Sequence, residues 1–406
     1  MVTSWIRMVM QNRKFLSSLV LIILVNGNLF SQAKKDTTII LINDVNVQIE
    51  ATDALKDMYN FKFGKAEAEM HDLQRHYAWH PLPYFMLGLN EWWKIMPNTK
   101  STAHDDKFFM YMDSAILVAN NLFKFYPEYK TEAAFFLAAA YGFKGRLYAD
   151  EERKNWRKAA SVGKDALNYL EICKQQNNLS PELLFGDALY NYFSVWVPEN
   201  YPALRPLLWF FRKGDKQLGL KQLKEVSYNA FYTRTEAMLW LMRICNSYEN
   251  DQTRAFQLSE YLYQSYPDNP YFHRYYARML YSRGMYKQLE PTAKSILARI
   301  DSGMTGYEFT SGRYASFYLG QLYGAQRKLD EAKKYYGMSV NFAEKNGDME
   351  SGYYLYSLIE LGEIAEKQGN KAEAKKYFKE VKKKADRKDE AFKDAKRRLQ
   401  GLEKGD

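Results

Sequence analysis

The hydrophobic and polar positions of this chain show no sustained stretch in which the two kinds alternate between turn residues, as they do in β-strands. Long stretches are instead rich in Ala, Leu, Lys, Glu and Tyr, and only 11 prolines occur in 406 residues, a composition that favours helix. With 47% hydrophobic residues the chain can bury a core. We therefore predict an all-α fold.

Two segments near the C-terminus have the same pattern and superimpose without a gap. The first contains Leu319, Gly320, Tyr323, Ala332 and Tyr336, and the second contains Leu361, Gly362, Ala365, Ala374 and Phe378. In each segment, a glycine lies twelve residues before an alanine. These small residues allow two antiparallel helices to pack with a distance between their axes near the short end of the usual range of about 8 to 10 Å. The pattern predicts a repeated helical hairpin.

These residues resemble the pattern of the tetratricopeptide repeat superfamily. The resemblance implies a right-handed α-solenoid of about seven hairpins, preceded by a helical pair at 54–61 and 65–77 and closed by a C-terminal capping helix. The first helices of the hairpins are expected to contain Leu87-Gly88, Leu137-Ala138, Phe185-Gly186, Met242-Arg243, Tyr276-Ala277, Leu319-Gly320 and Leu361-Gly362. Scaffolds of this superfamily bind other proteins or peptides, and we expect the same here.

The sequence Pro267-Asp268-Asn269-Pro270 marks a joint between two such hairpins. Pro267 cannot continue the preceding helix, whereas Pro270 is tolerated in the first turn of the next one. The distance from Arg243 to Ala277 is 34 residues, which is the period of the superfamily. Arg243 itself fits a small-residue position poorly.

A second resemblance covers residues 181–245, about a fifth of the chain. Gly186, Pro198, Gly214-Asp215 and Gly219-Leu220 occur in the order that is found in the tetratricopeptide-39 group and the related inclusion-body-clearance proteins. We take this resemblance only as support for one fused helical array, because proteins with helical repeats can have the same helix packing and different functions.

The N-terminus has the features of an export signal. Arg7, Arg13 and Lys14 precede the apolar run 15–25, and small residues at positions 31 and 33 predict cleavage after Ala33. An uncleaved anchor is the alternative. The predicted organisation is a signal peptide at 1–33, a linker at 34–48, the helical array at 49–385 and a basic capping helix or tail at 386–406. The mature chain is expected to be periplasmic or secreted.

The sequence contains no recognisable catalytic motif, and we expect neither enzymatic activity nor a cofactor. The strongest candidate for a metal site is a cluster of His71, His76 and His80, although Pro81 ends that helix at once. Exposed or capping histidines are the alternative. The two cysteines, Cys173 and Cys245, are expected to be buried and not bonded to each other.

The net charge of +10 comes largely from the two ends of the chain. Residues 371–404 hold fourteen Lys or Arg against seven Asp or Glu. This segment is either a polar capping helix or a site for an anionic partner; nucleic acid is disfavoured by export. A second surface feature is the apolar run 207–211 in the loop 201–213, which either contacts a membrane surface or folds back over its own repeat.

A possible binding surface is predicted from helical spacing. Tyr271, Arg274, Arg278 and Tyr281 share one stripe of a helix, and the corresponding positions of other hairpins include Trp240, Tyr314 and Phe317. The resemblance implies that these positions line a concave groove, here aromatic with a cationic centre, suited to a protein, an extended peptide or another polymer. The alternative is that rings, at 16% of residues, fill every face and the arginines stack on neighbouring tyrosines.

The function predicted from the sequence is therefore a non-enzymatic protein-binding scaffold. Two alternatives stay open: a membrane-peripheral scaffold that uses the loop 201–213 and the basic tail, and a metal-dependent enzyme that uses His71, His76 and His80.

Overall fold

The computed structural model of the chain describes residues 40–202, 205, 212–350 and 352–404. The predicted signal peptide at 1–33 and the apolar run 207–211 lie outside the described residues. Both stay predictions from the sequence alone.

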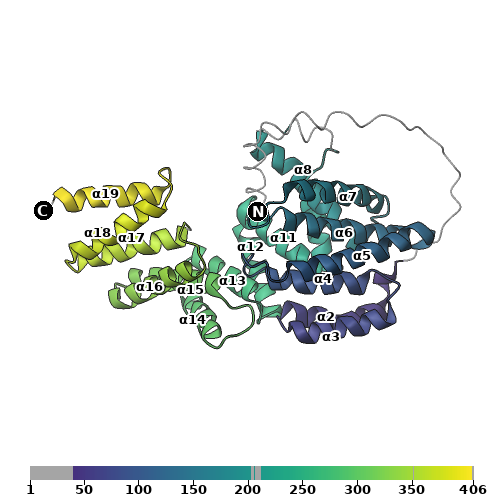
Figure 1. Cartoon of the computed structure of the whole chain (residues 1–406), viewed down its shortest axis with the longest axis horizontal. Coiled ribbons are helices and arrows are strands. Elements are labelled where there is room, and N and C mark those ends of the chain that lie inside the picture. The colour runs from purple at the N-terminus through teal and green to yellow at the C-terminus, as the bar shows by residue number, and fades with distance from the viewer. Residues whose placement is uncertain (1–39, 203–204, 206–211, 351, 405–406) are drawn as a thin grey trace. The chain divides into compact units, whose positions relative to one another are not determined.

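The described residues form helices and no strand, which confirms the all-α class and the TPR-like hairpins (Figure 1). Contacts between α-carbons divide the chain into two compact units. Unit 1 comprises residues 1–58, 62–95 and 99–250, and unit 2 comprises 59–61, 96–98 and 251–406. No helix in the described part of the chain combines the length and apolar character needed to cross a bilayer.

Unit 1 begins with the predicted helical pair and continues with successive hairpins. Its α-helices are α2 (Val45–Tyr59), α3 (Phe63–His76), α4 (Leu82–Ile95), α5 (Asp105–Phe125), α6 (Lys130–Tyr148), α7 (Trp156–Lys174), α8 (Leu184–Asn200), α10 (Lys216–Asn229) and α11 (Arg234–Ser247). Short 3-10 helices at Leu41–Asn43, Pro127–Tyr129 and Pro181–Leu183 precede α2, α6 and α8. Helix α4 packs on α5, α6 on α7, and α8 on α10. Helix α2 starts inside the segment 34–48 that was predicted to be a linker.

Unit 2 contains three consecutive hairpins and a terminal helix. Its helices are α12 (Gln252–Ser265), α13 (Pro270–Ser282), α14 (Tyr286–Asp301), α15 (Phe309–Ala325), α16 (Leu329–Lys345), α17 (Gly352–Lys367), α18 (Lys371–Lys384) and α19 (Glu390–Lys404). Helix α13 packs on α14, α15 on α16, and α17 on α18, while α19 covers α18. The first helices α13, α15 and α17 also contact one another in order.

The small-residue positions allow the two helices of each hairpin to pack closely. A Cβ atom added to Gly320 would lie 2.6 Å from the ring of Tyr336, and one added to Gly362 would lie 2.4 Å from the ring of Phe378. Both rings are almost fully buried. The glycine therefore makes room for the aromatic ring of the second helix, as the repeated pattern predicted.

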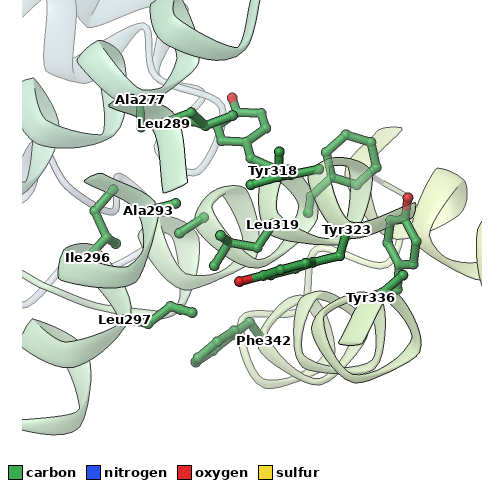
Figure 2. Packing of buried hydrophobic residues seen from close by; sticks show 14 of the residues in the cluster. Ala277, Leu289, Ala293, Ile296, Leu297, Tyr318, Leu319, Tyr323, Tyr336 and Phe342 are labelled. Atoms are coloured by element: carbon green, nitrogen blue, oxygen red, sulfur yellow. The ribbon is translucent and has the colours of Figure 1, made fainter. Parts of the chain in front are cut away.

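The core of unit 2 is continuous from α13 to α17. Figure 2 shows Leu319 and Tyr323 of α15 between the apolar side chains of α14 and those of α16. Tyr318, on the same helix, stacks on Tyr281 of α13. The labelled contacts of α14 are Leu289, Ala293, Ile296 and Leu297, and those of α16 are Tyr336 and Phe342. Each second helix thus shares its apolar side with two first helices, which is how successive hairpins bury a common core.

The joint at 267–270 has the structure that its sequence predicts. Helix α12 ends at Ser265, and α13 starts at Pro270. The side chain of Asn269 accepts hydrogen bonds from the backbone N–H groups of Tyr271 (3.0 Å) and Phe272 (3.1 Å), so it caps the new helix.

The boundary between the units falls between α11 and α12, within the predicted hairpin that contains Arg243. Arg243 does not act as a small residue. Its guanidinium lies over the ring of Trp240, 5.1 Å from the ring centroid, inside unit 1.

Candidate functional site

The first helices of unit 2 bring aromatic side chains and one exposed arginine together. We call this cluster the aromatic face. It consists of Tyr275, Arg278 and Tyr281 from α13, Tyr314, Phe317 and Tyr318 from α15, and Tyr353 from α17. Three consecutive repeats therefore contribute to one surface.

Ring contacts connect the three helices. Tyr281 stacks on Tyr318 with centroids 4.6 Å apart, and Tyr353 contacts Tyr314 at 4.6 Å and Phe317 at 4.7 Å. The hydroxyl oxygens of Tyr318 and Tyr353 are 3.2 Å apart and form a hydrogen bond. Burial raises the pKa of both phenols, so both keep their protons at neutral pH. Such linked rings offer rigid contact area at low cost in conformational entropy.

Arg278 is the charged group of the aromatic face. Its side chain is exposed, and its guanidinium lies 5.9 Å from the ring centroid of Tyr275. Desolvation by the surrounding groups acts to lower the pKa of Arg278, but the nearby tyrosines 275, 353, 318 and 314 raise it on balance. No carboxylate of the described residues forms an ion pair with it. The guanidinium is thus charged, close to four tyrosines and available to an anion.

Arg274, one turn earlier on α13, is different because its partners are internal. Its Nη1 lies 3.5 Å from Glu308 Oε1 and donates hydrogen bonds to Ser311 Oγ (3.2 Å) and to the carbonyl oxygen of Pro97 (3.3 Å). Only 12% of the Arg274 side chain is exposed. Its guanidinium also lies over Tyr314. Arg274 therefore has partners within unit 2, which Arg278 lacks among the described residues.

The other predicted groove residues divide between the units. Tyr281, Tyr314 and Phe317 lie together in the aromatic face, whereas Tyr271 packs beside Arg274, whose guanidinium lies 5.4 Å from its ring centroid. Trp240 belongs to unit 1 and is not part of this face. Whether these residues bind a ligand stays a prediction.

The sequence interpretation missed Tyr275, Tyr318 and Tyr353. Tyr275 and Tyr318 each lie two positions before the small residue of their helix, Ala277 and Gly320. Tyr275 is three residues before Arg278, and Tyr318 is four residues after Tyr314, so helical spacing alone places each on the face of a residue already selected. That spacing is the signal that would have found Tyr275 and Tyr318, whereas Tyr353 lies on a helix from which no groove residue had been selected.

Unit 1 has an arginine that lies between aromatic rings and close to a buried carboxyl group. The guanidinium of Arg146 lies 4.5 Å from the ring centroid of Trp92 and 5.1 Å from that of Trp240. Close by, Glu236 is buried and accepts a hydrogen bond from Trp93 Nε1 at 3.1 Å. Burial raises the pKa of Glu236, and Arg146 opposes this by stabilising the charged form. Helices α4, α6 and α11 are thereby tied together through one polar and aromatic cluster.

The three histidines of the predicted metal site do not converge. His71 Nδ1 lies 2.9 Å from Gln74 Oε1, and exposed His76 Nδ1 lies 3.1 Å from Glu50 Oε2. His80 is fully buried, and its Nδ1 accepts a hydrogen bond from the Leu82 N–H at 3.2 Å. Within the described ranges no three His, Cys, Asp or Glu side chains are arranged to hold a metal ion.

The two cysteines are buried and free, as expected from their positions in different hairpins. Cys173 lies in α7 and Cys245 in α11. Burial raises the pKa of the Cys173 thiol to about 12, so this side chain is a poor nucleophile at neutral pH.

Comparison with known families identifies one repeat directly. A family model described as "Tetratricopeptide repeat" matches residues 356–386, which include most of α17 and all of α18. No curated protein sequence matches the chain.

Three solved structures that match the chain are distant from it in sequence. A human IFIT1 dimer with PPP-AAAA is 14% identical, with a TM-score of 0.40 and coverage of 79% of this chain and 68% of that one. The P58(IPK) TPR domain is 13% identical, with a TM-score of 0.25 and coverage of 89% and 99%. Naa15/Naa10 bound to HypK-THB is 13% identical, with a TM-score of 0.30 and coverage of 88% and 73%.

The matched repeat contains Gly362 and Phe378, and the same glycine-to-ring contact occurs at Gly320 and Tyr336 in the preceding hairpin. Repeat folds of this kind generally act as scaffolds for protein–protein interaction. The chain therefore carries a tetratricopeptide repeat among hairpins with the same packing, which confirms its predicted resemblance to the tetratricopeptide repeat superfamily.

Proposed function

We propose that this chain is a non-enzymatic scaffold whose aromatic face binds an extended peptide segment that carries a carboxylate. Arg278 is the anchor for the carboxylate, and the rings of Tyr281, Tyr314 and Tyr353 contact neighbouring side chains of the peptide. The observation that carries the proposal is that Arg278 is exposed among tyrosines and has no ion-pair partner in the described part of the chain.

The chemistry of the face favours a carboxylate over a neutral group. A guanidinium presents a planar set of donors that matches the two oxygens of a carboxylate, and a hydrogen bond between charged groups is roughly twice as strong as a neutral one. Because the phenols of Tyr318 and Tyr353 keep their protons, they add no negative charge that would compete with the carboxylate. Aromatic rings that are already packed lose little entropy when the peptide binds.

An array of short synthetic peptides tests the proposal with the full chain. Matched peptides that differ only in having carboxylates or the corresponding amides are probed with wild type, with Arg278→Glu and with Lys287→Glu. Lys287 is exposed on α14, outside the aromatic face, so the control has the same change of charge. We expect wild type and Lys287→Glu to retain the carboxylate peptides and Arg278→Glu to bind them about tenfold less tightly or worse.

Two outcomes contradict this function. Equal retention of carboxylate and amide peptides by wild type excludes anchoring by a carboxylate. Unchanged retention by Arg278→Glu excludes the aromatic face as the site, provided that its circular dichroism spectrum matches that of wild type.

We also propose that the scaffold works outside the cytoplasm, on the basis of residues 1–33. N-terminal sequencing of the protein isolated from the producing organism tests this. A mature protein that starts at Lys34 supports export, whereas an intact Met1 in a protein recovered from the cytoplasm contradicts it.

A further inference from the structure

A second surface, distant in sequence from the aromatic face, is strongly basic and hollowed. A pocket of about 660 Å³ lies where α18 turns into α19. Figure 1 shows these two helices near the C-terminus. The pocket is lined by Lys382 and Lys383 from α18, Ala385 and Arg387 from the turn, and Phe392 and Lys396 from α19. Four of these six residues carry a positive charge, and we call them the pocket cations.

None of the pocket cations forms an ion pair with a described carboxylate. Lys382 lies over the ring of Phe392, with its Nζ 6.0 Å from the ring centroid. Lys383, Arg387 and Lys396 are exposed. Four like charges around one concavity repel one another, so this arrangement lowers stability unless an anion is bound.

The acidic residues in this part of the chain are occupied elsewhere. In the turn, Asp386 Oδ1 accepts a hydrogen bond from the Lys388 N–H at 2.9 Å, and Asp389 Oδ2 accepts one from the Asp386 N–H at 3.2 Å. These carboxylates stabilise the turn and form no ion pair with the pocket cations.

On α19, the acids pair with cations that do not line the pocket. Glu390 bonds to Lys393 Nζ at 2.6 Å, and Asp394 forms ion pairs with Arg397 and Arg398. The acidic residues of α19 therefore offset the charge of other cations on the same helix and form no ion pair with the pocket cations. The pocket keeps an excess of positive charge although acids are interleaved in the sequence.

Helix electrostatics explain only part of the cluster. Lys382 and Lys383 lie in the last turn of α18, where a positive charge is favoured by the helix dipole. Arg387 lies beyond that helix, and Lys396 lies in the middle of α19. These two residues have no such reason to face the same pocket.

We propose that this pocket binds a ligand with two or more phosphate groups. A lysine ammonium is a compact charge that binds phosphate oxygens without a fixed geometry, and Arg387 adds a bidentate donor. A multiply charged anion matches four cations better than a single carboxylate does. Phe392 provides an apolar wall for the part of the ligand that carries the phosphates. The site is independent of Arg278 and of the function proposed above.

Two sources supply this chemistry: a soluble phosphorylated compound and the headgroups of an anionic membrane. Binding of inorganic pyrophosphate to the full chain is measured by calorimetry, and binding to phosphatidylglycerol vesicles by co-sedimentation. Both are repeated with Lys383→Glu/Lys396→Glu and with a control, Lys376→Glu/Lys388→Glu. The control residues are exposed, do not line the pocket, and give the same change in net charge.

We expect pyrophosphate to bind wild type and the control with similar affinity, and the pocket variant about tenfold less tightly or worse. If wild type and the control bind vesicles but not pyrophosphate, and the pocket variant binds vesicles more weakly, the site is assigned to lipid headgroups. Absence of both kinds of binding overturns the proposal. Equal weakening in the pocket variant and the control also overturns it, because the effect is then one of net charge.

Discussion

The two units use arginine among aromatic rings in opposite ways. In unit 1, Arg146 lies between Trp92 and Trp240 and acts on buried Glu236. In unit 2, Arg278 lies among tyrosines but is exposed and has no carboxylate partner in the described residues. The same repeat architecture thus has one arginine that lies near a buried carboxyl group and another that is exposed.

This difference teaches that an aromatic and cationic pattern does not by itself define a binding site. Buried charges contribute to stability only when their partners are in place, and exposed charges contribute little. The contrast between Arg146 and Arg278 can therefore be tested by stability as well as by binding. All eight tryptophans precede residue 251, so tryptophan fluorescence follows unit 1, whereas circular dichroism follows both units.

The largest expected effect is that of Arg146→Gln on unit 1. Loss of this charge leaves buried Glu236 with only the more weakly coupled Arg243 as a nearby cation and removes two ring contacts, which should cost about 3 kcal/mol. Urea unfolding followed by tryptophan fluorescence measures the change. Arg278→Gln is the matched control and should leave the stability of the protein within about 0.5 kcal/mol of wild type. Similar losses in the two variants would remove the contrast between the units.

The next effect concerns the hairpin packing of unit 2. Gly362→Ala places a methyl group 2.4 Å from the buried ring of Phe378, so we expect a loss of about 2 to 3 kcal/mol. Gly337→Ala is the control, because this glycine is exposed in α16 with no atom within 4 Å of the added Cβ, and it should gain up to about 1 kcal/mol.

Unfolding followed by circular dichroism distinguishes these two glycine variants. If Gly362→Ala is as stable as Gly337→Ala, the close approach of α17 and α18 is not required. A shift of the tryptophan transition in Gly362→Ala would show that the two units do not unfold separately.

A third effect depends on pH through His273. This side chain is buried in α13, and burial lowers its pKa from 6.5 to about 3. The unfolded chain binds a proton on His273 more readily than the folded chain does. The contribution of neutral His273 to the free energy of unfolding is therefore complete above pH 6.5 and declines as the pH falls toward 3. At pH 5 the loss should be about 2 kcal/mol.

Unfolding of wild type and His273→Gln across this pH range measures the contribution. The variant should lose stability less steeply on acidification, although it is less stable at neutral pH because the contact with Tyr307 at 2.9 Å is weakened. Parallel curves for the two proteins would contradict a neutral buried His273.

The smallest stability effect is expected for Arg274→Gln. The glutamine has no charge to pair with Glu308, and its shorter side chain loses the hydrogen bonds to Ser311 and Pro97. The free energy of unfolding should fall by about 1 to 2 kcal/mol. Circular dichroism should detect this loss, and Arg278→Gln again serves as the control. Equal stability of the two variants would show that Arg274 is as free as Arg278.

The sequence was sufficient for features that depend on local spacing. The twelve-residue offset placed Gly320 and Gly362 against the following helix, and Asn269-Pro270 started α13 as expected. These features follow from residues that are close together along the chain. The same reasoning identified Tyr281, Tyr314 and Phe317 as neighbours on successive first helices.

Other features depend on partners that are far apart in the sequence. Arg274 and Arg278 share one helical stripe, but only Arg274 meets Glu308 and the backbone of Pro97, which lies 177 positions away. Helical spacing cannot anticipate such a contact. The charge of the C-terminal segment is a similar case. The sequence gives only the totals of acids and bases in 371–404, whereas the structure shows that the carboxylates of Asp386 and Asp389 bond to backbone N–H groups of the turn.

The central claim, that the aromatic face is where a carboxylate peptide binds, is tested most directly by site-specific photo-crosslinking. Benzoylphenylalanine replaces Tyr275, whose ring lies beside Arg278, or Tyr261, which is exposed on α12 outside this face. A carboxylate peptide from the array should attach at position 275 and not at 261, and Arg278→Glu should abolish the attachment. Equal attachment at both positions, or attachment that persists in Arg278→Glu, would contradict the account.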